Sequence, residues 1–354
     1  MKPGSEAELA DMVAAAQGPL EIFGGGSRKG LGNAVVGDRL EVGGLSGISL
    51  YDPGALTLAV KAGTPLVEVE AALVAENQML PFEPMDHATL FGNAGRATVG
   101  GMVAVNASGP RRLKAGACRD SLIGLRYVNG QGQIIKNGGR VMKNVTGYDL
   151  VKLMAGAHGT LGVITEVAFK LLPKPEATAT LHFELGLADG LAKLREVMAS
   201  PYDISAAAYA DGAALLRLEG FAESVAYRAG KIGGDKIEGA GPWAEIKNAT
   251  ALAGADAVWR LSVKPSDAAA LVAGLAARGF SAPVLDWSGG LIWLSGGDGS
   301  DAPRQAVSAL GGHATCIIGA HTAFQPENPV IATLNNGLRQ KFDPRGIFNQ
   351  GRMG

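Results

Sequence analysis

The residues best suited to chemistry in this chain are glycines that cluster beside small polar side chains. One cluster spans residues 24–28, a second 98–101 and a third 159–164. Because glycine has no Cβ atom, its backbone N–H groups can approach a ligand closely and it adopts positive φ without steric cost. Successive N–H groups of this kind bind anions. The clusters therefore predict a wall of backbone donors around a large anionic ligand, to which Arg28 can add a charged hydrogen bond.

The first cluster does not match the common nucleotide-binding loops. Gly24-Gly25-Gly26-Ser27 fits neither the GxGxxG pattern nor the GxxxxGK[ST] pattern. A Rossmann dehydrogenase is therefore disfavoured. The alternative to an anion site is a glycine-rich turn that leaves Arg28 exposed to solvent.

Cysteine and histidine give no support for a metal centre. Cys118 and Cys316 are the only cysteines and form no CxxC pair, so the chain alone has too few thiolates for an iron–sulfur cluster. The five histidines show neither HxH nor HExxH spacing. We expect no metal site, and electrons that leave a redox ligand here need an acceptor on another molecule.

Composition indicates a folded chain with room for two domains. Of its 354 residues, 47% are hydrophobic and 18% charged, and the formal net charge is -1. A near-neutral surface has no long-range attraction for nucleic acid or anionic membrane. No run of eighteen apolar residues occurs, and residues 1–6 lack the basic start and apolar stretch of a secretory signal. We expect a cytoplasmic protein whose membrane association, if any, comes through partners.

The elements expected to position the first two clusters are short. A helix over residues 5–16 and a strand over 20–23 precede the triple glycine. A half-buried strand is expected over 56–62, followed by a helix with Thr64 as N-cap and Pro65 as its first residue. The buried face of that helix is expected to contain Leu66, Val69 and Leu73.

A hairpin is predicted around Asn129-Gly130-Gln131-Gly132, because Asn and Gly tolerate the positive φ of tight turns. A short helix over 149–155 and a strand over 162–172 follow. Pro173-Lys174-Pro175 interrupts both helix and strand pairing, so a domain boundary is expected there.

The rest of the chain alternates strand-like and helical runs, which favours an antiparallel sheet backed by helices on one face. The expected strands are 179–185, 213–219, 257–263 and 291–294, and the expected helices 187–199, 224–232 and 266–278. A last helix is expected over 329–342. The overall expectation is a mixed α+β fold without repeats.

Together these motifs resemble the FAD-binding domain of the vanillyl-alcohol oxidase or PCMH flavoprotein superfamily. Within it, the chain is most similar to the smaller FAD-binding subunits of bacterial glycolate oxidases. The segments that carry the resemblance are 22–27, 52–54, 98–109, 116–120, 143–173, 311–315 and 342–353. The resemblance implies a two-part PCMH-type FAD-binding domain over 1–173 and 325–354, plus a small antiparallel α+β cap domain over 176–320.

The resemblance also implies which residues contact FAD. They are Gly24, Gly25, Gly26, Ser27, Arg28, Thr98, Val99, Gly100, Gly101, Asn106, Ser108, Gly109, Gly159, Thr160, Gly162, Val163, Ile164 and Asn349. For the polar members the alternative is that each satisfies its own backbone, as Asn and Ser commonly do in turns. Superfamily members with covalent flavin use a His in the first loop, where this chain has Ser27. Cys118 is more readily explained as a buried, inert thiol, so we expect dissociable FAD.

Oxidation of a 2-hydroxy acid by a flavin requires a base for the hydroxyl proton and a cation for the carboxylate. Gly297-Asp298-Gly299-Ser300 imitates the His-rich catalytic motif of the larger subunit, but no His flanks it. Arg112 and Arg260 are the candidate cations, although an Arg beside a Trp is often a packing residue. The sequence assigns no catalytic base.

The leading hypothesis is an FAD-binding subunit of a glycolate oxidase or dehydrogenase. It would work with a catalytic flavoprotein subunit and an iron–sulfur subunit, on a small 2-hydroxy acid such as glycolate. One alternative is an autonomous FAD-dependent oxidoreductase that acts on a 2-hydroxy acid or another alcohol. The other is a scaffold subunit whose FAD is structural.

Overall fold

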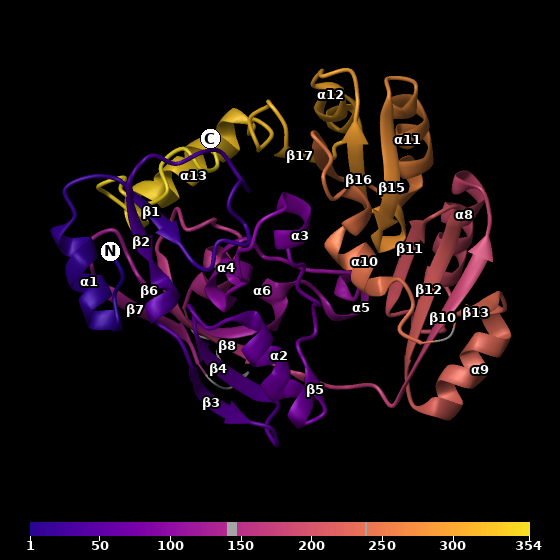
Figure 1. Cartoon of the computed structure of the whole chain (residues 1–354), viewed down its shortest axis with the longest axis horizontal. Coiled ribbons are helices and arrows are strands. Elements are labelled where there is room, and N and C mark those ends of the chain that lie inside the picture. The colour runs from indigo at the N-terminus through magenta and orange to yellow at the C-terminus, as the bar shows by residue number, and fades with distance from the viewer. Residues whose placement is uncertain (140–146, 238) are drawn as a thin grey trace.

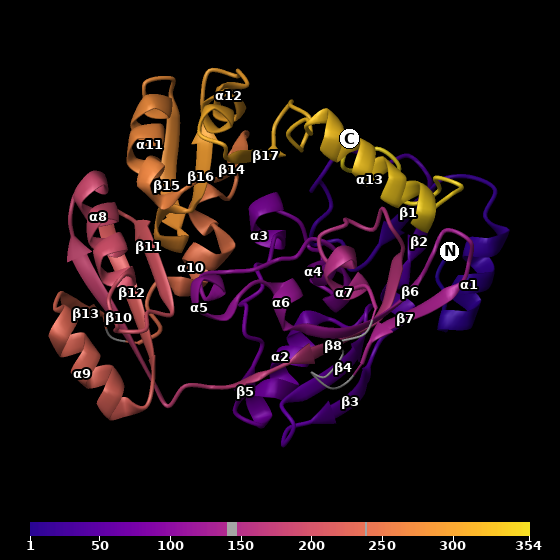
Figure 2. The same cartoon turned by 180° about the vertical axis from the view of Figure 1, so that it is seen from behind.

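A computed structural model describes residues 1–139, 147–237 and 239–354. Two lobes lie side by side, each built on one sheet, and the segment between β9 (Leu172–Pro173) and β10 (Ala177–Glu184) joins them (Figures 1 and 2). Residues 143–146, which begin the 143–173 segment of the family resemblance, lie outside the described residues. None of the helices in the described part of the chain combines the length and apolar character needed to cross a bilayer.

The first lobe contains a five-stranded antiparallel sheet. Its order is β3 (Ile48–Asp52), β4 (Thr57–Lys61), β8 (Val163–Lys170), β6 (Leu122–Val128) and β7 (Ile134–Gly138). A separate parallel pair is formed by β1 (Leu20–Phe23) and β2 (Asp38–Glu41), and an antiparallel pair by β5 (Gln78–Met79) and β9. Pro173 thus takes part in strand pairing, contrary to the expected break, because β9 is a two-residue strand at the edge of a two-stranded sheet.

Short helices surround this sheet. They are α1 (Glu6–Ala15), α2 (Leu66–Ala75), α3 (Ala88–Phe91), α4 (Val99–Ala104), α5 (Arg112–Ala115), α6 (Cys118–Ser121) and α7 (Leu150–Met154). The buried face of α2 is the predicted one, Leu66, Val69 and Leu73, and it packs in the same core as Leu58 and Val60 of β4.

Two details near α2 differ from the sequence expectation. The helix begins one residue later, at Leu66 with Pro65 as N-cap, because the Thr64 hydroxyl is used by neighbouring backbone: it donates to the Lys61 carbonyl at 2.7 Å and accepts from the Gly47 N–H at 2.9 Å. The strand before it is not half-buried. Four of the five residues of β4 are buried, since β3 and β8 flank it in the sheet.

The predicted hairpin joins β6 and β7, but its turn is held mainly by side-chain hydrogen bonds and not by positive φ at several residues. Asn129 organises it, because the Asn129 Oδ1 accepts hydrogen bonds from the N–H groups of Gln131 and Gln133. Only Gly132, with φ of 77°, has the positive φ that was expected of the turn residues.

The second lobe holds an eight-stranded antiparallel sheet. Its order is β13 (Asp235–Ile237), β10, β12 (Ala213–Gly220), β11 (Ala206–Ala210), β15 (Phe280–Asp286), β16 (Leu291–Gly296), β14 (Val258–Ser262) and β17 (His313–Ile318). All four strands and all three helices expected in this region are present.

Helices cover one face of this sheet: α8 (Leu187–Met198), α9 (Ala222–Ile232), α11 (Ala268–Ala276) and α12 (Ala302–Ala309). The opposite face is also covered, which the sequence did not indicate. It packs on α10 (Trp243–Asn248) and on Leu31, Met85 and Leu90 of the first lobe. The two lobes therefore share an apolar core.

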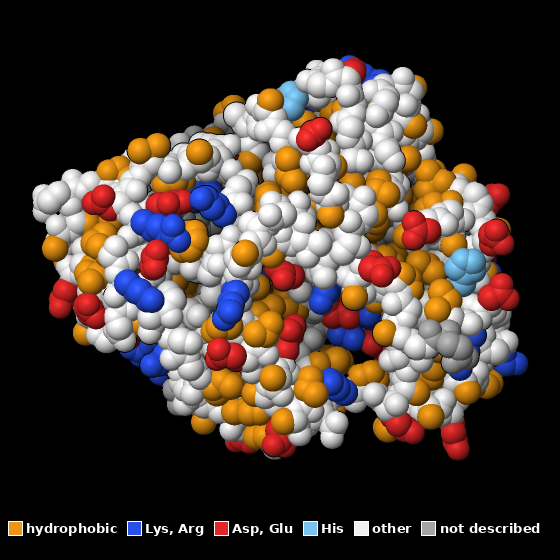
Figure 3. All heavy atoms as spheres, viewed as in Figure 1, with side chains coloured by type: hydrophobic (Ala, Val, Ile, Leu, Met, Phe, Trp, Pro, Cys, Tyr) orange, Lys and Arg blue, Asp and Glu red, His pale blue; other side chains and the backbone are white. Residues whose placement is uncertain are grey.

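A buried charge network also joins the lobes. Glu83 of the first lobe accepts two hydrogen bonds from Arg217 of β12, both at 2.8 Å. Arg111 of the first lobe donates to Glu219 of β12 at 2.6 and 3.0 Å, and its own N–H donates to Glu83. Acidic and basic side chains gather in the hollow between the lobes (Figure 3). The lobes are thus held together by paired charges as well as by apolar contact.

This network predicts loss of stability in acid. Burial would raise the pKa of Glu83, but the hydrogen bonds and charge of Arg217 outweigh it and lower that pKa. Because the folded pKa is lowered, the stabilisation is complete above the unfolded pKa of about 4.3 and is lost as pH falls through the folded value. We expect the free energy of unfolding, measured by denaturant titration, to fall steeply below about pH 4. The free energy of unfolding should depend less steeply on pH in Glu83→Gln than in the parent. An equal dependence in both proteins would show that Glu83 does not cause the loss of stability in acid.

The C-terminal segment returns to the first lobe. α13 (Pro329–Phe342) has the predicted bounds, and the chain after it reaches β1, where Phe348 bridges Leu20. Arg345 fixes this segment by donating to the carbonyls of Val13 and Gly130. In Figure 1 the segment runs beside β1 and β2, so both ends of the chain build the same region.

Candidate functional site

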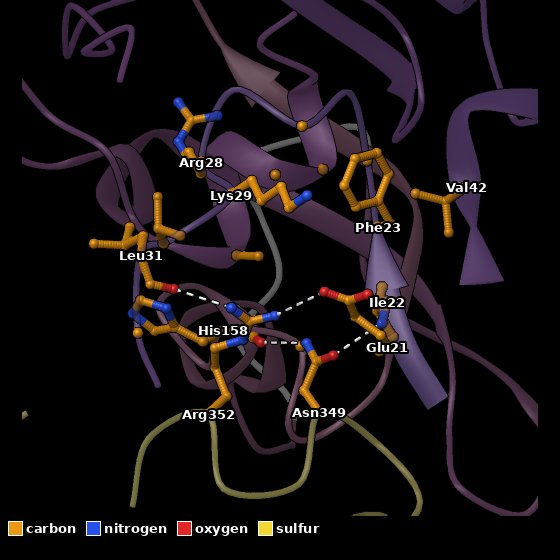
Figure 4. A pocket seen from close by; sticks show the side chains of 18 of the residues that line it. Glu21, Ile22, Phe23, Arg28, Lys29, Leu31, Val42, His158, Asn349 and Arg352 are labelled. Carbon is orange, nitrogen blue, oxygen red and sulfur yellow. Dashed lines mark hydrogen bonds and ion pairs between the residues drawn. The ribbon is translucent and has the colours of Figure 1, made fainter. Parts of the chain in front are cut away.

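A cavity of about 770 Å³ lies where β1, α4, the 158–164 segment and the C-terminal segment meet (Figure 4). This volume lies within the usual range for small-molecule and cofactor sites. Thirteen of the residues predicted to contact FAD line it: Gly24, Gly25, Gly26, Ser27, Arg28, Thr98, Gly100, Gly101, Gly159, Gly162, Val163, Ile164 and Asn349. Three sequence-distant glycine clusters thus form one wall.

The turn after β1 must consist of glycines because neighbouring parts of the chain lie too close for side chains. A Cβ on Gly24 would lie 2.6 Å from Thr98 Oγ1, and one on Gly25 would lie 2.0 Å from the Arg96 carbonyl oxygen. Gly26 has φ of 83°, which disfavours other residues. This turn packs closely on residues 96–98, where Gly26 forms an isolated bridge with Arg96, and its backbone lies at the cavity surface.

The two glycines of α4 face different surroundings. Thr98 is the N-cap, and its hydroxyl oxygen accepts from the Gly101 N–H at 3.4 Å. A Cβ on Gly100 would lie 2.7 Å from the Ala62 Cβ, inside the core, whereas the nearest atom to a Cβ on Gly101 is Thr98 Oγ1 at 3.2 Å. Val99 is fully buried in the core and does not line the cavity.

Arg28 is held in the cavity wall and has no acidic hydrogen-bond partner among the residues that the structure describes. Its Nη2 donates to the Met85 carbonyl at 3.0 Å, and its buried Nε makes no hydrogen bond. Burial lowers the pKa of Arg28 to about 10, although the negative charge of Asp86 opposes the shift. The guanidinium therefore stays charged at neutral pH and can interact with an anion.

The third cluster lines the same cavity as the first. Gly159 has φ of 71°, and a Cβ there would lie 2.7 Å from Asn349 Nδ2. Thr160 does not line the cavity, because its hydroxyl donates to the Ala157 carbonyl at 2.7 Å. His158, which the sequence reasoning did not single out, does line it. Burial, together with the positive charge of Arg352, lowers the pKa of His158 to about 4, so its ring is neutral near pH 7.

Asn349 joins three segments at the cavity wall. Its Oδ1 accepts from the Ile22 N–H at 2.8 Å, and its Nδ2 donates to the His158 carbonyl at 2.8 Å (Figure 4). Its own N–H donates to the Leu20 carbonyl, and its φ of 42° is unusual outside glycine. Both sequence interpretations of Asn349 therefore describe it in part: it lines the cavity, and its side chain satisfies the protein's own backbone.

We expect Asn349→Ala to lower the free energy of unfolding by about 1–3 kcal/mol, because it leaves the Ile22 N–H and the His158 carbonyl without partners. The dissociation constant for the bound cofactor should rise as well. Denaturant unfolding and equilibrium dialysis measure the two effects. Asn336→Ala, on the exposed side of α13, is the control and should change neither quantity.

Asn106, Ser108 and Gly109 line a second cavity, of about 230 Å³, beside the first. The side chains of the first two also serve nearby backbone. Asn106 Oδ1 accepts from the Arg119 N–H, and Ser108 Oγ accepts from the Cys118 N–H at 2.9 Å. The two candidate cations, Arg112 and Arg260, line this second cavity together.

The first cavity suits a dinucleotide. Arg28, Lys29 and Arg352 contribute positive charge, against the single acid Glu21, which lies 3.6 Å from Arg352. A pyrophosphate requires such an excess of positive charge together with backbone donors.

The sequence reasoning missed several lining residues, namely Glu21, Ile22, Phe23, Lys29, Gly30, Leu31, Gly32, Ala34, Val35, Val42, Ala104, Val105, His158 and Arg352. Of these, Ile22, Phe23, Ala104, Val105, His158 and Arg352 fall inside segments that carried the resemblance.

Residues 1–138 match the family described as FAD binding domain. Glycolate oxidase subunit GlcE of Escherichia coli K12 is 38% identical over 339 residues, which cover 95% of this chain and 92% of that protein. The chain belongs to the GlcE family. Membership confirms the resemblance inferred from the sequence and establishes FAD as the cofactor.

Other similarities of this GlcE-family chain are more limited. Glycolate oxidase subunit GlcD of Bacillus subtilis 168 is 39% identical over 126 residues, which cover 36% of this chain and 25% of that protein. The solved structure of an alkyldihydroxyacetonephosphate synthase superimposes with a TM-score of 0.70 at 16% identity, over 99% of this chain and 76% of that one. The latter similarity confirms the predicted α+β, PCMH-type fold.

FAD should be released intact when this GlcE-family chain is denatured. The first glycine loop carries Ser27 and no His, and Cys118 is fully buried and does not line the first cavity. Burial also raises the pKa of the Cys118 thiol, which keeps it protonated and unreactive. Acid precipitation followed by a spectrum of the supernatant measures the release. Yellow colour that stays with the pellet would show a covalent link.

Proposed function

We propose that this chain is the FAD-holding subunit of a complex that oxidises glycolate or a similar 2-hydroxy acid. A catalytic flavoprotein subunit and an iron–sulfur subunit complete the complex, which lies in the cytoplasm. The observation that carries the proposal is the 38% identity, over nearly the whole length of both chains, to a protein named as a glycolate oxidase subunit.

FAD occupies the 770 Å³ cavity in this proposal. The turn of residues 24–26 and Arg28 hold its pyrophosphate, and Gly101 and residues 159–164 form the remaining wall. Support comes from the convergence of these segments on one cavity and from the buried Arg28 Nε, which has no protein partner. FAD supplies the redox chemistry when bound. The chain's own residues orient it and neutralise its charge.

The same proposal divides the chain into an FAD-binding domain of residues 1–173, a cap domain of 176–320 and a returning segment of 325–354. The five-stranded sheet lies within the first range and the eight-stranded sheet within the second. The returning segment includes Asn349 and Arg352, which line the cavity of the first domain.

Purification of the tagged chain from its native source, with identification of the proteins that accompany it, tests the proposal. We expect a second flavoprotein and an iron–sulfur protein in constant ratio with this chain, and one FAD per copy of the chain. A chain that purifies alone with full glycolate-oxidising activity would contradict the subunit role. A chain without FAD would contradict the cofactor assignment.

The second cavity favours another function, in which this chain itself oxidises a small acid. The sequence shows no complete set of base and cation, but the structure brings Arg112, Arg260 and His87 to one cavity beside the flavin site. Anaerobic mixing of the FAD-loaded chain with excess glycolate separates the functions. Bleaching of the flavin within seconds indicates an autonomous enzyme. A flavin that stays oxidised but bleaches in the assembled complex indicates a relay, and one that bleaches in neither indicates a scaffold.

A further inference from the structure

One wall of the first cavity is formed by residues 29–36, which we call the strap and which lie between β1 and β2. No helix or strand includes them. Half of the strap residues are exposed, and the apolar Val36 is 88% exposed. The strap therefore borders both the cavity and the solvent. Six of its residues line the cavity: Lys29, Gly30, Leu31, Gly32, Ala34 and Val35.

The strap has few hydrogen bonds of its own. Between residues 32 and 36, the Asn33 N–H is the one backbone donor that has an acceptor among the described residues, the Arg352 carbonyl at 3.0 Å. Gly30 and Gly32 have φ of 106° and 88°, in the region where glycine rotates without steric cost. A segment with so little backbone bonding opens at a low free-energy cost. The strap can therefore move without disturbing a sheet or a helix.

The side chain of Asn33 ties the strap to two other segments. Its Nδ2 donates to the Gly351 carbonyl at 3.0 Å, and its Oδ1 accepts from the Ala323 N–H at 2.8 Å. Ala323 lies in the segment that leaves the second lobe, and its carbonyl accepts from the Cys316 N–H of β17 at 2.8 Å. One side chain thus joins the strap to the C-terminal segment and to the second lobe.

Arg352 adds a further contact to the closed strap. Its Nη1 donates to the Leu31 carbonyl at 3.2 Å (Figure 4). A Cβ on Gly32 would lie 2.6 Å from the Arg352 Cδ, so the absence of a side chain there lets the strap approach the C-terminal segment. This close approach places Asn33 within hydrogen-bond distance of Gly351.

Secondary structure or core packing fixes the other walls of this cavity. β1 is paired with β2 and bonded to Asn349, and residues 163–164 belong to β8, which β4 and β6 flank in the sheet. In α4, Val99 and Met102 are buried in the core. The lobes are joined by an apolar core and by buried ion pairs, so they do not separate easily.

Release of a bound cofactor requires one of these walls to move, because cofactor cavities enclose most of their ligand. The strap has neither strand pairing nor a helix to hold it. Loops of this kind commonly control access to enclosed sites. We propose that the strap is the gate through which FAD enters and leaves the first cavity, and that Asn33 is the positioning residue that keeps this gate closed.

The inference rests on the proposed function only for the placement of FAD in the first cavity. Because Asn33 is bonded to Ala323, the second lobe takes part in retaining a cofactor that the first lobe binds. Exchange of FAD is thus controlled by a contact outside the cavity lining, since Asn33 itself does not line the cavity.

The rates of FAD exchange in Asn33→Ala test the gate. The substitution removes both side-chain hydrogen bonds, so the dissociation rate of FAD should rise about tenfold. The rise of flavin fluorescence after dilution of the holoprotein measures this rate. The association rate of FAD with the apoprotein should rise as well, because a gate limits both directions. A residue that only stabilised bound FAD would change dissociation alone. Asn336→Ala, at an exposed asparagine, is the control and should change neither rate.

Cleavage by trypsin after Lys29 provides a second test, since Lys29 is an exposed residue of the strap. Cleavage of a native protein follows the population of its open form. We expect the fragment that begins at Gly30 to form faster in the apoprotein than in the holoprotein, and faster in Asn33→Ala than in the parent for both forms. Cleavage after Lys231, an exposed residue of α9 in the second lobe, is the control and should not depend on FAD.

The parent alone keeps the proposal testable if Asn33→Ala does not fold, because its apoprotein and holoprotein can still be compared. Equal cleavage after Lys29 in these two forms, or unchanged exchange rates in a folded Asn33→Ala, contradicts the gate and leaves the FAD assignment standing. Parent protein that holds no FAD contradicts the proposed function. Faster cleavage of Asn33→Ala in that case still supports the role of Asn33 in closing the strap.

Discussion

Gly101→Val is expected to weaken FAD binding strongly while the chain stays folded. A side chain at this position enters the first cavity, where the nearest atoms to its Cβ are Thr98 Oγ1 at 3.2 Å and Arg28 Nη1 at 3.6 Å. No backbone atom obstructs it, in contrast to Gly25, where a Cβ would meet a carbonyl oxygen at 2.0 Å. We expect the dissociation constant for FAD, measured by fluorescence titration of the apoprotein, to rise about 100-fold, as overpacking of a close contact does.

Gly274→Val is the matched control. Gly274 also lies inside a helix, α11, and a Cβ there would meet no atom within 4 Å. The control carries the same change in helix propensity, so it separates that effect from obstruction of the cavity. Circular dichroism near that of the parent in both variants, with FAD lost only from Gly101→Val, is the expected result. Normal FAD content in Gly101→Val would remove α4 from the cofactor site.

Glu83→Ala is expected to lower the free energy of unfolding by about 3–5 kcal/mol, the usual cost of removing one partner from a buried ion pair. The Glu83 side chain is 17% exposed and accepts two hydrogen bonds from Arg217, whose side chain is 4% exposed. Its removal leaves the buried Arg217 with a hydrogen bond to Ser205 Oγ at 3.1 Å and, among carboxylates of the described residues, only the longer contact to Glu219 at 3.6 Å. Denaturant unfolding followed by fluorescence measures the loss.

Glu196→Ala provides the contrast. Glu196 forms an ion pair with Lys193 on α8 but is 68% exposed, so solvent screens the pair and its loss should cost under about 1 kcal/mol. Equal losses in the two variants would show that the charge network between the lobes does not stabilise the chain. Because the network crosses between the lobes, Glu83→Ala should also make the unfolding transition less cooperative.

Much of the fold follows from local sequence pattern, and particular elements show where local pattern no longer predicts the structure. α13 and the strands β10 and β12 have clear apolar patterning, and all three form where expected. β11 is composed almost entirely of alanine, which has no strand preference of its own, and it forms because β12 and β15 pair with it on either side.

The convergence of the glycine clusters on the first cavity was largely predictable, and the residues of the second cavity were not. Glycine clusters and the segments that carry the family resemblance lie contiguously in the sequence, so their convergence could be expected. His87, Asp286 and Arg260 are each isolated in the sequence, and only the packing of one lobe on the other brings them together. The reason for these glycines also depends on tertiary contacts. At Gly24, Gly25 and Gly100 a Cβ would collide with neighbouring protein atoms, whether or not a ligand is bound.

The three hydrogen bonds of Asn349 have a consequence for the order of events during synthesis. This residue is synthesised after both β1 and the segment beside His158, yet its side chain ties the two together. A nascent chain can fold its five-stranded sheet early, but the first cavity lacks one wall until Asn349 has been synthesised. We therefore expect chains that terminate before Asn349 to retain no FAD and to remain colourless.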